Sequence, residues 1–272
     1  MIESIYAAPK FVDLQQAVDF AVSQQIHYEV PVFMSPELLE KQDEELIKYQ
    51  QMFSGLQGKM SVHGPVFDTN PVSMDPCINK CSRTRYRQAI QAAKELGAKY
   101  IVFHSQYSPV YKVANVYQDW LAGSIDYWGQ IVADELEGSD LTILMENFMD
   151  DRPDILVDMA EGVDSPNFKV CLDTGHANLF SQVSAVDWVD TMSSHLDYIH
   201  AHNNHGELDD HNGFLDGNID MDGFLNHLVL LPRKINLALE IFNMEALESS
   251  YHMLKPYMRV QEEYNESRSF LV

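Results

Sequence analysis

Histidine, aspartate and glutamate residues recur where short, apolar, β-branched segments of the chain end. Nine of them lie at such an end or in the loop that follows it: His63, His104, Glu146, Asp173, His176, His200, Asp209, His211 and Glu240. Imidazole and carboxylate groups together are suited to bind divalent zinc, manganese, cobalt or magnesium. These nine residues are therefore the candidate metal ligands of the chain.

The joint occurrence of these residues matters more than any one of them. A single histidine at a strand end is more often a hydrogen-bonded structural residue than a ligand. Here six successive segments deliver His, Asp or Glu. Several carboxylates gathered in one place repel one another unless a cation neutralises them. The pattern as a whole therefore predicts a metal site.

Three further residues keep two interpretations each. His202 and His205 either orient a ligand or contact substrate, or they are solvated loop residues. Glu29 either reaches the same site or is an ordinary solvated or helix-capping carboxylate. Most of the acidic residues between 207 and 220 are expected to be solvated, and only Asp209 is singled out, by its spacing to His211.

The segments that precede these residues alternate with segments of helical periodicity along the whole chain. Predicted strands cover residues 2–6, 27–33, 60–63, 100–104, 141–146, 168–173, 198–202 and 235–241. Predicted helices cover residues 13–25, 36–53, 77–96, 115–137, 154–160, 183–196, 221–228 and 245–257. The segment after Tyr257 is expected to be a tail or a final cap.

Eight strand-then-helix units imply parallel strands joined by right-handed crossovers. Over 272 residues without a Pro/Gly/Ser-rich linker, they predict a single-domain (β/α)8 TIM barrel that spans residues 1–272. In such a barrel the carboxyl ends of all strands meet at one mouth. The candidate ligands are therefore expected to converge there.

Composition restricts the partners and the compartment. The chain has 18 Lys and Arg against 41 Asp and Glu, so 18 − 41 = −23, a charge that repels phosphate backbones and anionic lipid.

No apolar stretch approaches the ~20 residues of a membrane span, and residues 1–6 lack signal-peptide features. Three cysteines are an odd and sparse set, which favours reduced thiols in a cytoplasm, with Cys77 and Cys81 on one helix face.

The motifs around the candidate ligands, taken in order, resemble those of the xylose isomerase-like barrels. This superfamily holds sugar and sugar-phosphate isomerases and epimerases, and apurinic-site nucleases of the endonuclease IV type. The matching segments cover nearly the whole chain: Val62-His63-Gly64-Pro65, Phe103-His104-Ser105, Met145-Glu146-Asn147, Leu172-Asp173-Thr174-Gly175-His176, the stretch from His200 through Asp209-Asp210-His211 to Gly217-Asn218-Ile219-Asp220, and Leu239-Glu240.

The isomerase branch of the superfamily implies one metal ion. Its ligand set maps onto Glu146, Asp173, His200 and Glu240. In the epimerases of the family, two glutamates act as bases on opposite faces of the substrate carbon. The resemblance implies these roles for Glu146 and Glu240, and contact with substrate for His176. All of these residues are present in the chain.

The nuclease branch implies three zinc ions, and the chain has a counterpart for each ligand. The implied sets are His63, His104 and Glu146 for the first ion; Glu146, Asp173, His200 and Glu240 for the second; and His176, Asp209 and His211 for the third. Clustered ions of this kind suit phosphoester cleavage. The chain departs from the family pattern at Asn203, where Asp is usual.

The scarcity of positive charge near the strand ends argues against a duplex nucleic acid as substrate. The loops after the strands carry only Lys10, Lys112 and Arg152 as clear basic residues, whereas duplex binding commonly needs several phosphate contacts. The basic cluster Lys80, Arg83, Arg85 and Arg87 is expected to be a salt-bridged helix surface.

The sequence thus predicts a cytoplasmic enzyme with one to three divalent ions (Zn, Mn, Co or Mg) that isomerises or epimerises a small sugar or sugar phosphate. The alternative is a multinuclear zinc phosphoesterase that acts on a small or single-stranded substrate. A third, less favoured interpretation is a catalytically silent barrel that binds a sugar. The sequence makes no prediction of the oligomeric state.

Overall fold

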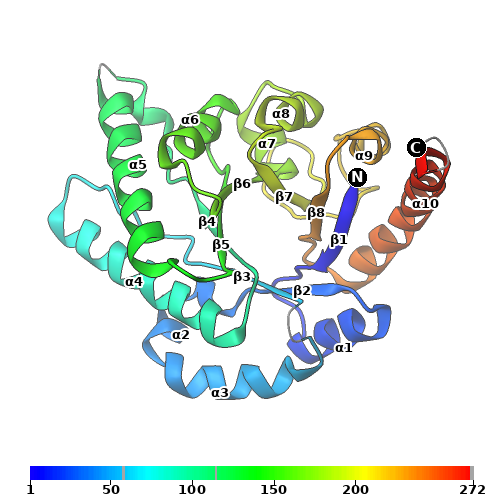
Figure 1. Cartoon of the computed structure of the whole chain (residues 1–272), viewed down its shortest axis with the longest axis horizontal. Coiled ribbons are helices and arrows are strands. Elements are labelled where there is room, and N and C mark those ends of the chain that lie inside the picture. The colour runs from blue at the N-terminus through cyan, green and yellow to red at the C-terminus, as the bar shows by residue number, and fades with distance from the viewer. Residues whose placement is uncertain (57–58, 114, 270–272) are drawn as a thin grey trace.

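The strands of the computed structural model form one closed parallel barrel, as predicted. The structure describes residues 1–56, 59–113 and 115–269, with side chains up to residue 258. Each strand pairs with the next, and the first pairs with the last (Figure 1). The strands are β1 (Ile2–Ala7), β2 (His27–Val30), β3 (Met60–His63), β4 (Tyr100–His104), β5 (Thr142–Glu146), β6 (Phe168–Asp173), β7 (Leu196–Ala201) and β8 (Ile235–Leu239).

Helices follow the strands and surround the barrel (Figure 1). They are α1 (Leu14–Gln24), α2 (Pro36–Glu40), α3 (Gln42–Met52), α4 (Pro76–Leu96), α5 (Val116–Glu135), α6 (Asp154–Val163), α7 (Thr174–Phe180), α8 (Ala185–Met192), α9 (Met221–Leu230) and α10 (Met244–Ser269). Three short 3-10 turns are η1 (Val32–Met34), η2 (Ser54–Leu56) and η3 (Pro109–Tyr111). Asp75 caps α4 with its side chain, and Gly97 ends it at φ 67°.

Several predicted boundaries were wrong. The second strand ends at Val30, because Pro31 has no N–H to continue the ladder. The predicted helix over 36–53 is divided into α2 and α3 at Lys41. The last helix does not end at Tyr257 but continues to Ser269, with Pro256 inside it. Helix α7 is not among the predicted helices, and it follows directly on the strand predicted over residues 168–173.

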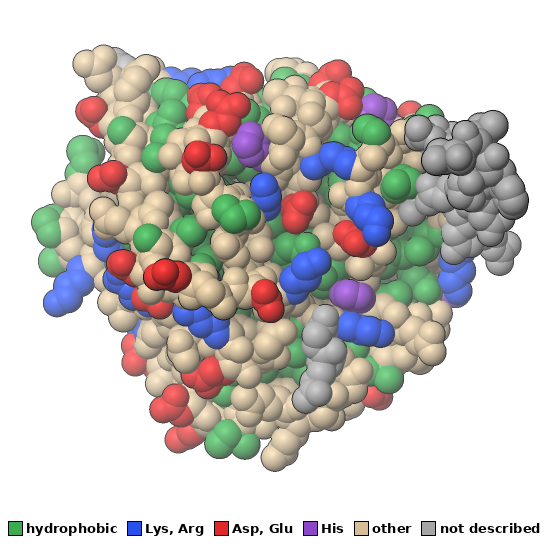
Figure 2. Space-filling view, in the orientation of Figure 1, with side chains coloured by type: hydrophobic (Ala, Val, Ile, Leu, Met, Phe, Trp, Pro, Cys, Tyr) green, Lys and Arg blue, Asp and Glu red, His purple; other side chains and the backbone are tan. Residues whose placement is uncertain are grey.

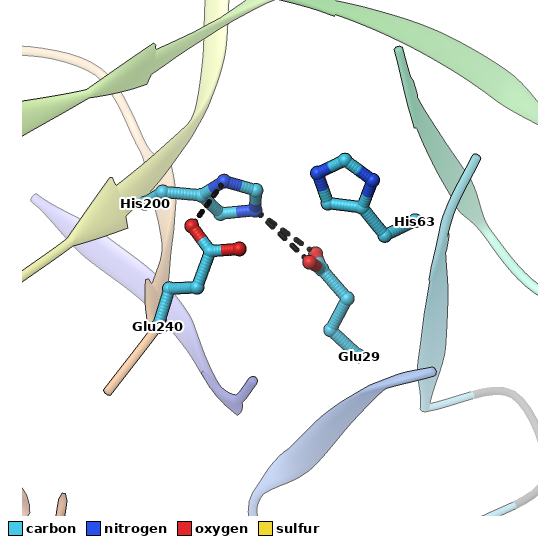
Figure 3. A group of neighbouring side chains, drawn as sticks. All are labelled: Glu29, His63, His200 and Glu240. Carbon is cyan, nitrogen blue, oxygen red and sulfur yellow. Dashed lines mark hydrogen bonds and ion pairs between the residues drawn. The ribbon is translucent and has the colours of Figure 1, made fainter. Parts of the chain in front are cut away.

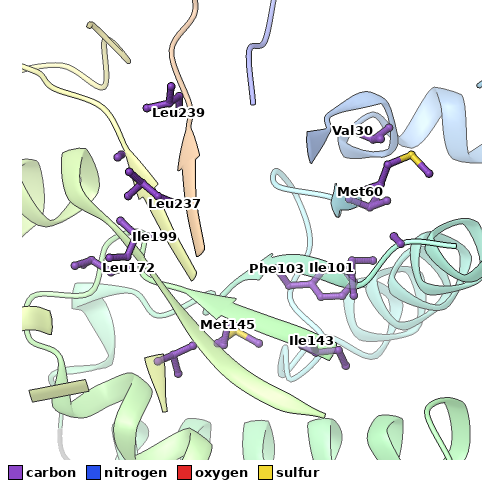
Figure 4. Close-up of a cluster of buried hydrophobic side chains, with 14 of the residues drawn as sticks. Val30, Met60, Ile101, Phe103, Ile143, Met145, Leu172, Ile199, Leu237 and Leu239 are labelled. Atoms are coloured by element: carbon purple, nitrogen blue, oxygen red, sulfur yellow. The ribbon is translucent and has the colours of Figure 1, made fainter. Parts of the chain in front are cut away.

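Two sets of side chains build the core, because neighbouring residues of a strand point to opposite faces. One set packs between the strands and the helices and includes Ile101, Phe103 and Ile143 (Figure 4). The other fills the inside of the barrel: Tyr6, Ala8, Tyr100, Val102, Leu144, Cys171, Tyr198 and Ala238. This inner layer forms the apolar support beneath the mouth.

The charges on the surface are dispersed. On the face shown in Figure 2, Lys and Arg side chains are interspersed with Asp and Glu. Two of the four basic residues at the start of α4 form ion pairs, Arg85 with Glu40 and Arg87 with Glu135. Arg83 instead donates a hydrogen bond to the carbonyl of Pro71 and lies over the ring of Tyr127. In the described part of the chain, none of the helices has the length and apolar character needed to cross a membrane.

Candidate metal centre

The alternation of side chains along each strand brings the candidate ligands to one place. In five places along the barrel, a candidate ligand follows a residue of the inner apolar layer by two positions. Its side chain therefore points to the same inward face. The pairs are Val102 and His104, Leu144 and Glu146, Cys171 and Asp173, Tyr198 and His200, and Ala238 and Glu240. The register pairs His104 with Glu146 and Asp173 with His200 across neighbouring strands.

The four residues of the one-ion set converge on Nδ1 of His200. This nitrogen lies 2.8 Å from Glu146 Oε1, 3.1 Å from Glu240 Oε2 and 3.9 Å from Asp173 Oδ2. All four side chains are fully buried. They come from β5, β6, β7 and the residue after β8, so the closure of the barrel itself brings them together.

A second group shares Glu146 with the first. The other carboxylate oxygen, Oε2, lies 3.3 Å from His63 Nε2 and 3.2 Å from His104 Nε2. Glu146 therefore has one oxygen in each group. This is the arrangement of a carboxylate that bridges two cation positions.

The third predicted group lies at the edge of the mouth. Asp209 Oδ2 is 3.2 Å from His176 Nε2 and 3.1 Å from His211 Nε2. The Asp209 side chain is 32% exposed, whereas both histidines are buried. All nine sequence-predicted residues thus lie in three adjoining groups.

Three of the imidazole rings are held as metal-binding histidines usually are, with one nitrogen fixed by the backbone and the other directed toward the carboxylates. A backbone carbonyl lies 2.9–3.0 Å from Nδ1 in each of them: Gly64 O for His63, Asn147 O for His176 and Glu240 O for His211. In each case Nε2 faces a carboxylate of the groups above. This orientation suits a cation that replaces the protons between nitrogen and oxygen.

Several buried atoms of the centre lack a hydrogen bond, among them Glu29 Oε1 and both carboxylate oxygens of Glu240. Two of these atoms, His63 Nε2 and Glu146 Oε2, face each other at 3.3 Å. Unsatisfied buried polar atoms are costly, and a bound cation would satisfy both at once. Together with the mixed nitrogen and oxygen donors, this fits a divalent ion such as zinc or manganese.

Electrostatics show how strongly the centre favours positive charge. Burial alone would raise the pKa of Glu146 and Glu240, but the nearby His200 holds both pKa values well below the usual range. Burial would lower the pKa of His176, yet Asp173 and Asp209 raise it to about 10. The carboxylates, Glu240 foremost, likewise raise the pKa of the buried His200 well above its usual value, so His176 and His200 retain their protons. A divalent cation would supply the same charge and release those protons.

Glu29 belongs to the centre, although the sequence left its place open. It is 1% exposed, and its carboxylate lies 3.1 Å from His200 Nε2, whereas Glu240 reaches Nδ1 of the same ring (Figure 3). Ser61 donates a hydrogen bond to it at 3.1 Å. Because a carboxylate only accepts, His200 donates Nε2–H to Glu29, and Nδ1 is left to face the ligand group.

Replacing Glu29 with alanine is expected to weaken metal binding by about 10- to 100-fold, since the partner that orients His200 is lost. Glu29→Gln keeps an acceptor for Nε2–H and should recover much of the affinity. Competition titration of zinc against a chromophoric chelator measures both variants. Equal affinity of Glu29→Ala and the unchanged protein would show that Glu29 does not orient His200.

The structure distinguishes His202 from His205, the two other residues for which the sequence left two interpretations. His202 is buried, with Nε2 3.0 Å from both oxygens of Asp173 and its ring stacked on His211 at 3.9 Å. His205 is exposed and pairs with Asp216 at 3.1 Å, as a solvated loop residue does. Lys10, which the sequence placed in a loop, is buried in an ion pair with Glu240.

The loop after β7 is fixed at its base by Asn203. Its side chain donates to the carbonyls of Phe214 and Ile219, and its backbone forms a β-bridge with Asn212. A Cβ at Gly217 would lie 2.2 Å from Asn203 Oδ1, so this close approach requires glycine. Asn203, the departure from the family pattern, therefore organises the loop that carries Asp209 and His211.

A pocket of about 370 Å³ lies above the centre. Its lining residues include Lys10, His104, His176, Asp209 and His211. Glu146 and Glu240, which are fully buried, do not line it. A small molecule in this pocket would meet the third group and His104 directly.

The fold and the site define a (β/α)8 barrel with a cluster of metal-ligating side chains at the carboxyl ends of its strands. A family model described as xylose isomerase-like TIM barrel matches residues 20–271, and the chain belongs to this family. The predicted family and fold are thereby confirmed.

Individual relatives are similar over most of the chain. The uncharacterized protein MJ1311 of Methanocaldococcus jannaschii is 27% identical over 225 residues, which is 80% of this chain and 76% of that protein. A D-tagatose 3-epimerase-like protein superposes with a TM-score of 0.78 at 22% identity, covering 96% of this chain and 99% of that one. The TTHB071 protein from Thermus thermophilus, soaked with ZnCl2, gives 0.77 at 22% identity over 94% and 98%. At these identities the structural likeness is one of fold.

Proposed function

We propose that the protein is a divalent-metal-dependent isomerase or epimerase that acts on a small hydroxycarbonyl compound of the sugar type. The observation that carries this proposal is the convergence of Glu146, Glu240 and Asp173 on Nδ1 of His200 beneath a pocket of small-molecule size. The likeness to an epimerase-like protein and to a protein soaked with zinc supports it.

Proton transfer is assigned to two carboxylates. A divalent ion held by Glu146, Asp173, His200 and Glu240 would polarise the substrate carbonyl and make the adjoining C–H more acidic. Glu146 and Glu240 come from β5 and the end of β8, and each has an oxygen within 3.1 Å of His200 Nδ1. One carboxylate removes the proton from carbon; the other, itself ionised, takes a proton from a neighbouring cationic group and delivers it to the opposite face or to the neighbouring carbon. For Glu240 that group is Lys10, whose ammonium pairs with it.

The experiment is an exchange assay in D₂O. Protein loaded with Mn²⁺ or Zn²⁺ is incubated with a panel of ketoses and related hydroxyketones, and NMR follows deuterium at the carbon beside the carbonyl. Metal-dependent incorporation supports the proposal. If no compound exchanges while the protein retains its metal, the proton-transfer function is wrong.

A second candidate is a multinuclear zinc phosphoesterase. Two observations favour it: Glu146 has one oxygen in each of two groups, and the third group of His176, Asp209 and His211 faces the pocket. Clustered divalent ions suit phosphoester hydrolysis.

The double variant Asp209→Ala with His211→Ala separates the two candidates. For the phosphoesterase, loss of the third group should reduce cleavage of a phosphodiester such as bis(p-nitrophenyl) phosphate by at least about 10²-fold, as removal of a principal charge-stabilising group does. Full cleavage by a variant that lacks this group would contradict the three-ion assignment. Absence of cleavage by the unchanged, fully loaded protein would contradict the second candidate altogether.

A further inference from the structure

The wall of the pocket above the metal centre is apolar. Of the twelve described residues that line it, seven have apolar side chains: Phe11, Met34, Val66, Phe67, Phe148, Phe180 and Phe242. None of the twelve is Ser, Thr, Asn, Gln, Tyr, Trp or Arg. The pocket therefore has a polar floor and an aromatic wall.

The aromatic wall begins at the candidate ligands. Phe148 stacks on His104 with ring centroids 4.9 Å apart, and Phe242 stacks on His211 at 3.9 Å. Further ring contacts continue outward, from Phe148 to Phe180 and from Phe242 to Phe11. Phe11 is 91% exposed, so the apolar surface extends from the floor to the rim.

Most polar groups of the lining already have partners, and the two atoms that lack one, His104 Nδ1 and Asp209 Oδ1, are buried. His176 and His211 face Asp209, His104 faces Glu146, and Lys10 pairs with Glu240. A ligand hydroxyl beyond the reach of the metal centre would therefore lose its hydrogen bonds to water and find no hydroxyl or amide side chain of the lining to replace them. An apolar substituent at the same place gains contact with the rings instead.

A phosphate group meets still less favourable conditions. Lys10 is the one Lys or Arg of the described lining, and it is neutralised by Glu240. Outside the lining, Lys112 and Arg152 both pair with Asp151, at 2.5 and 3.5 Å. The carboxylate of Asp209 faces the pocket and repels an anion.

We propose that this pocket selects an uncharged substrate with vicinal oxygens at one end and an apolar substituent at the other, and that it discriminates against phosphorylated and fully hydroxylated sugars. The proposal rests on the isomerase function above and names its substrate class. The oxygens lie toward the metal centre, and the apolar end lies among the phenylalanines. Deoxy, alkyl-substituted and aryl-substituted hydroxycarbonyl compounds belong to this class.

The test compares ligands that share one metal-chelating end. Hydroxamates bind divalent ions through two oxygens, so we would use benzohydroxamate, a four-carbon sugar hydroxamate and the terminal phosphate of that sugar hydroxamate. Calorimetry measures their binding to the full chain loaded with Mn²⁺. We expect benzohydroxamate to bind at least tenfold more tightly than the sugar hydroxamate, and the phosphate to bind most weakly.

Sugar hydroxamate or its phosphate binding as tightly as benzohydroxamate would overturn the proposal. Binding of none of the three would also overturn it, because the proposal places the chelating end at the metal centre. These outcomes are distinct from failure of the proposed function. If the protein exchanges deuterium in the D₂O assay but binds the three hydroxamates in the reverse order, only the proposed substrate class is wrong. If the hydroxamates bind in the expected order but no compound exchanges deuterium, only the proposed proton transfer is wrong.

A matched pair of variants tests the wall itself. Val66→Thr adds a hydroxyl to the pocket with little change of shape, and Val72→Thr adds the same group in a different pocket, beside Tyr111 and Trp120. We expect Val66→Thr to reduce the preference for benzohydroxamate over the sugar hydroxamate severalfold and Val72→Thr to leave it unchanged. An equal effect of both variants, or none of Val66→Thr, would show that the wall does not set the preference.

Discussion

Glu146→Gln is expected to lower turnover by about 10³-fold or more, because the substitution removes a group assigned to proton transfer. The amide that replaces the carboxylate cannot accept a proton, and it carries no charge toward His63, His104 and His200, all of which face Glu146 within 3.3 Å. Turnover in the exchange assay and metal content by elemental analysis should therefore fall together.

The matched control is Glu137→Gln, which makes the same chemical change at an exposed position. It should keep full turnover and full metal content. A Glu146→Gln protein that exchanges deuterium at an undiminished rate would refute the assignment of Glu146 as a base. If instead its metal content stays full and only turnover falls, Glu146 acts in proton transfer more than in holding the ion.

Removal of metal by a chelator is expected to lower the melting temperature by about 10 °C. Five carboxylates, Glu29, Glu146, Asp173, Asp209 and Glu240, lie in or beside the centre, and four of them are buried. A ligand at about 1,000 times its dissociation constant stabilises the folded state by about 4 kcal/mol. For a domain somewhat larger than 200 residues, each kcal/mol moves the melting temperature by about 2–4 °C.

Differential scanning calorimetry before and after chelation, and again after Zn²⁺ is added back, measures this change. The double variant Asp173→Asn with His200→Ala is the control, because it lacks two of the four groups that meet at His200 Nδ1. Its melting temperature should not respond to the chelator. An unchanged melting temperature in the native protein would show that no ion contributes to the stability of the mouth.

The fold was predictable because its signal repeats. Eight apolar segments, each followed by a helical pattern, leave few topologies other than a closed barrel. The boundaries were less predictable where tertiary packing decides. The break at Lys41 between α2 and α3 has no side-chain cap to mark it. The short helix α7 did have a local signal, because Asp173 caps it by accepting the N–H of His176 three residues on.

The gathering of the nine candidate residues at one mouth was predictable from the strand ends and the loops that follow them, and two further residues there had a readable signal. Glu29 lies between Tyr28 and Val30, which pack outside the barrel, so its side chain must point inward. His202 follows His200 by two positions and continues the same inward face. The ion pair between Lys10 and Glu240 had no such signal, because only closure of β1 against β8 brings these residues together.

The most direct test of the metal centre is the metal content of protein purified without a chelator. Elemental analysis should find at least one divalent ion per chain, and that content should fall in the Asp173→Asn, His200→Ala double variant. One manganese, cobalt or magnesium ion per chain favours the isomerase, and two or three zinc ions favour the phosphoesterase. Native protein that contains no more metal than the double variant, even after incubation with Zn²⁺ or Mn²⁺, would contradict the existence of the centre.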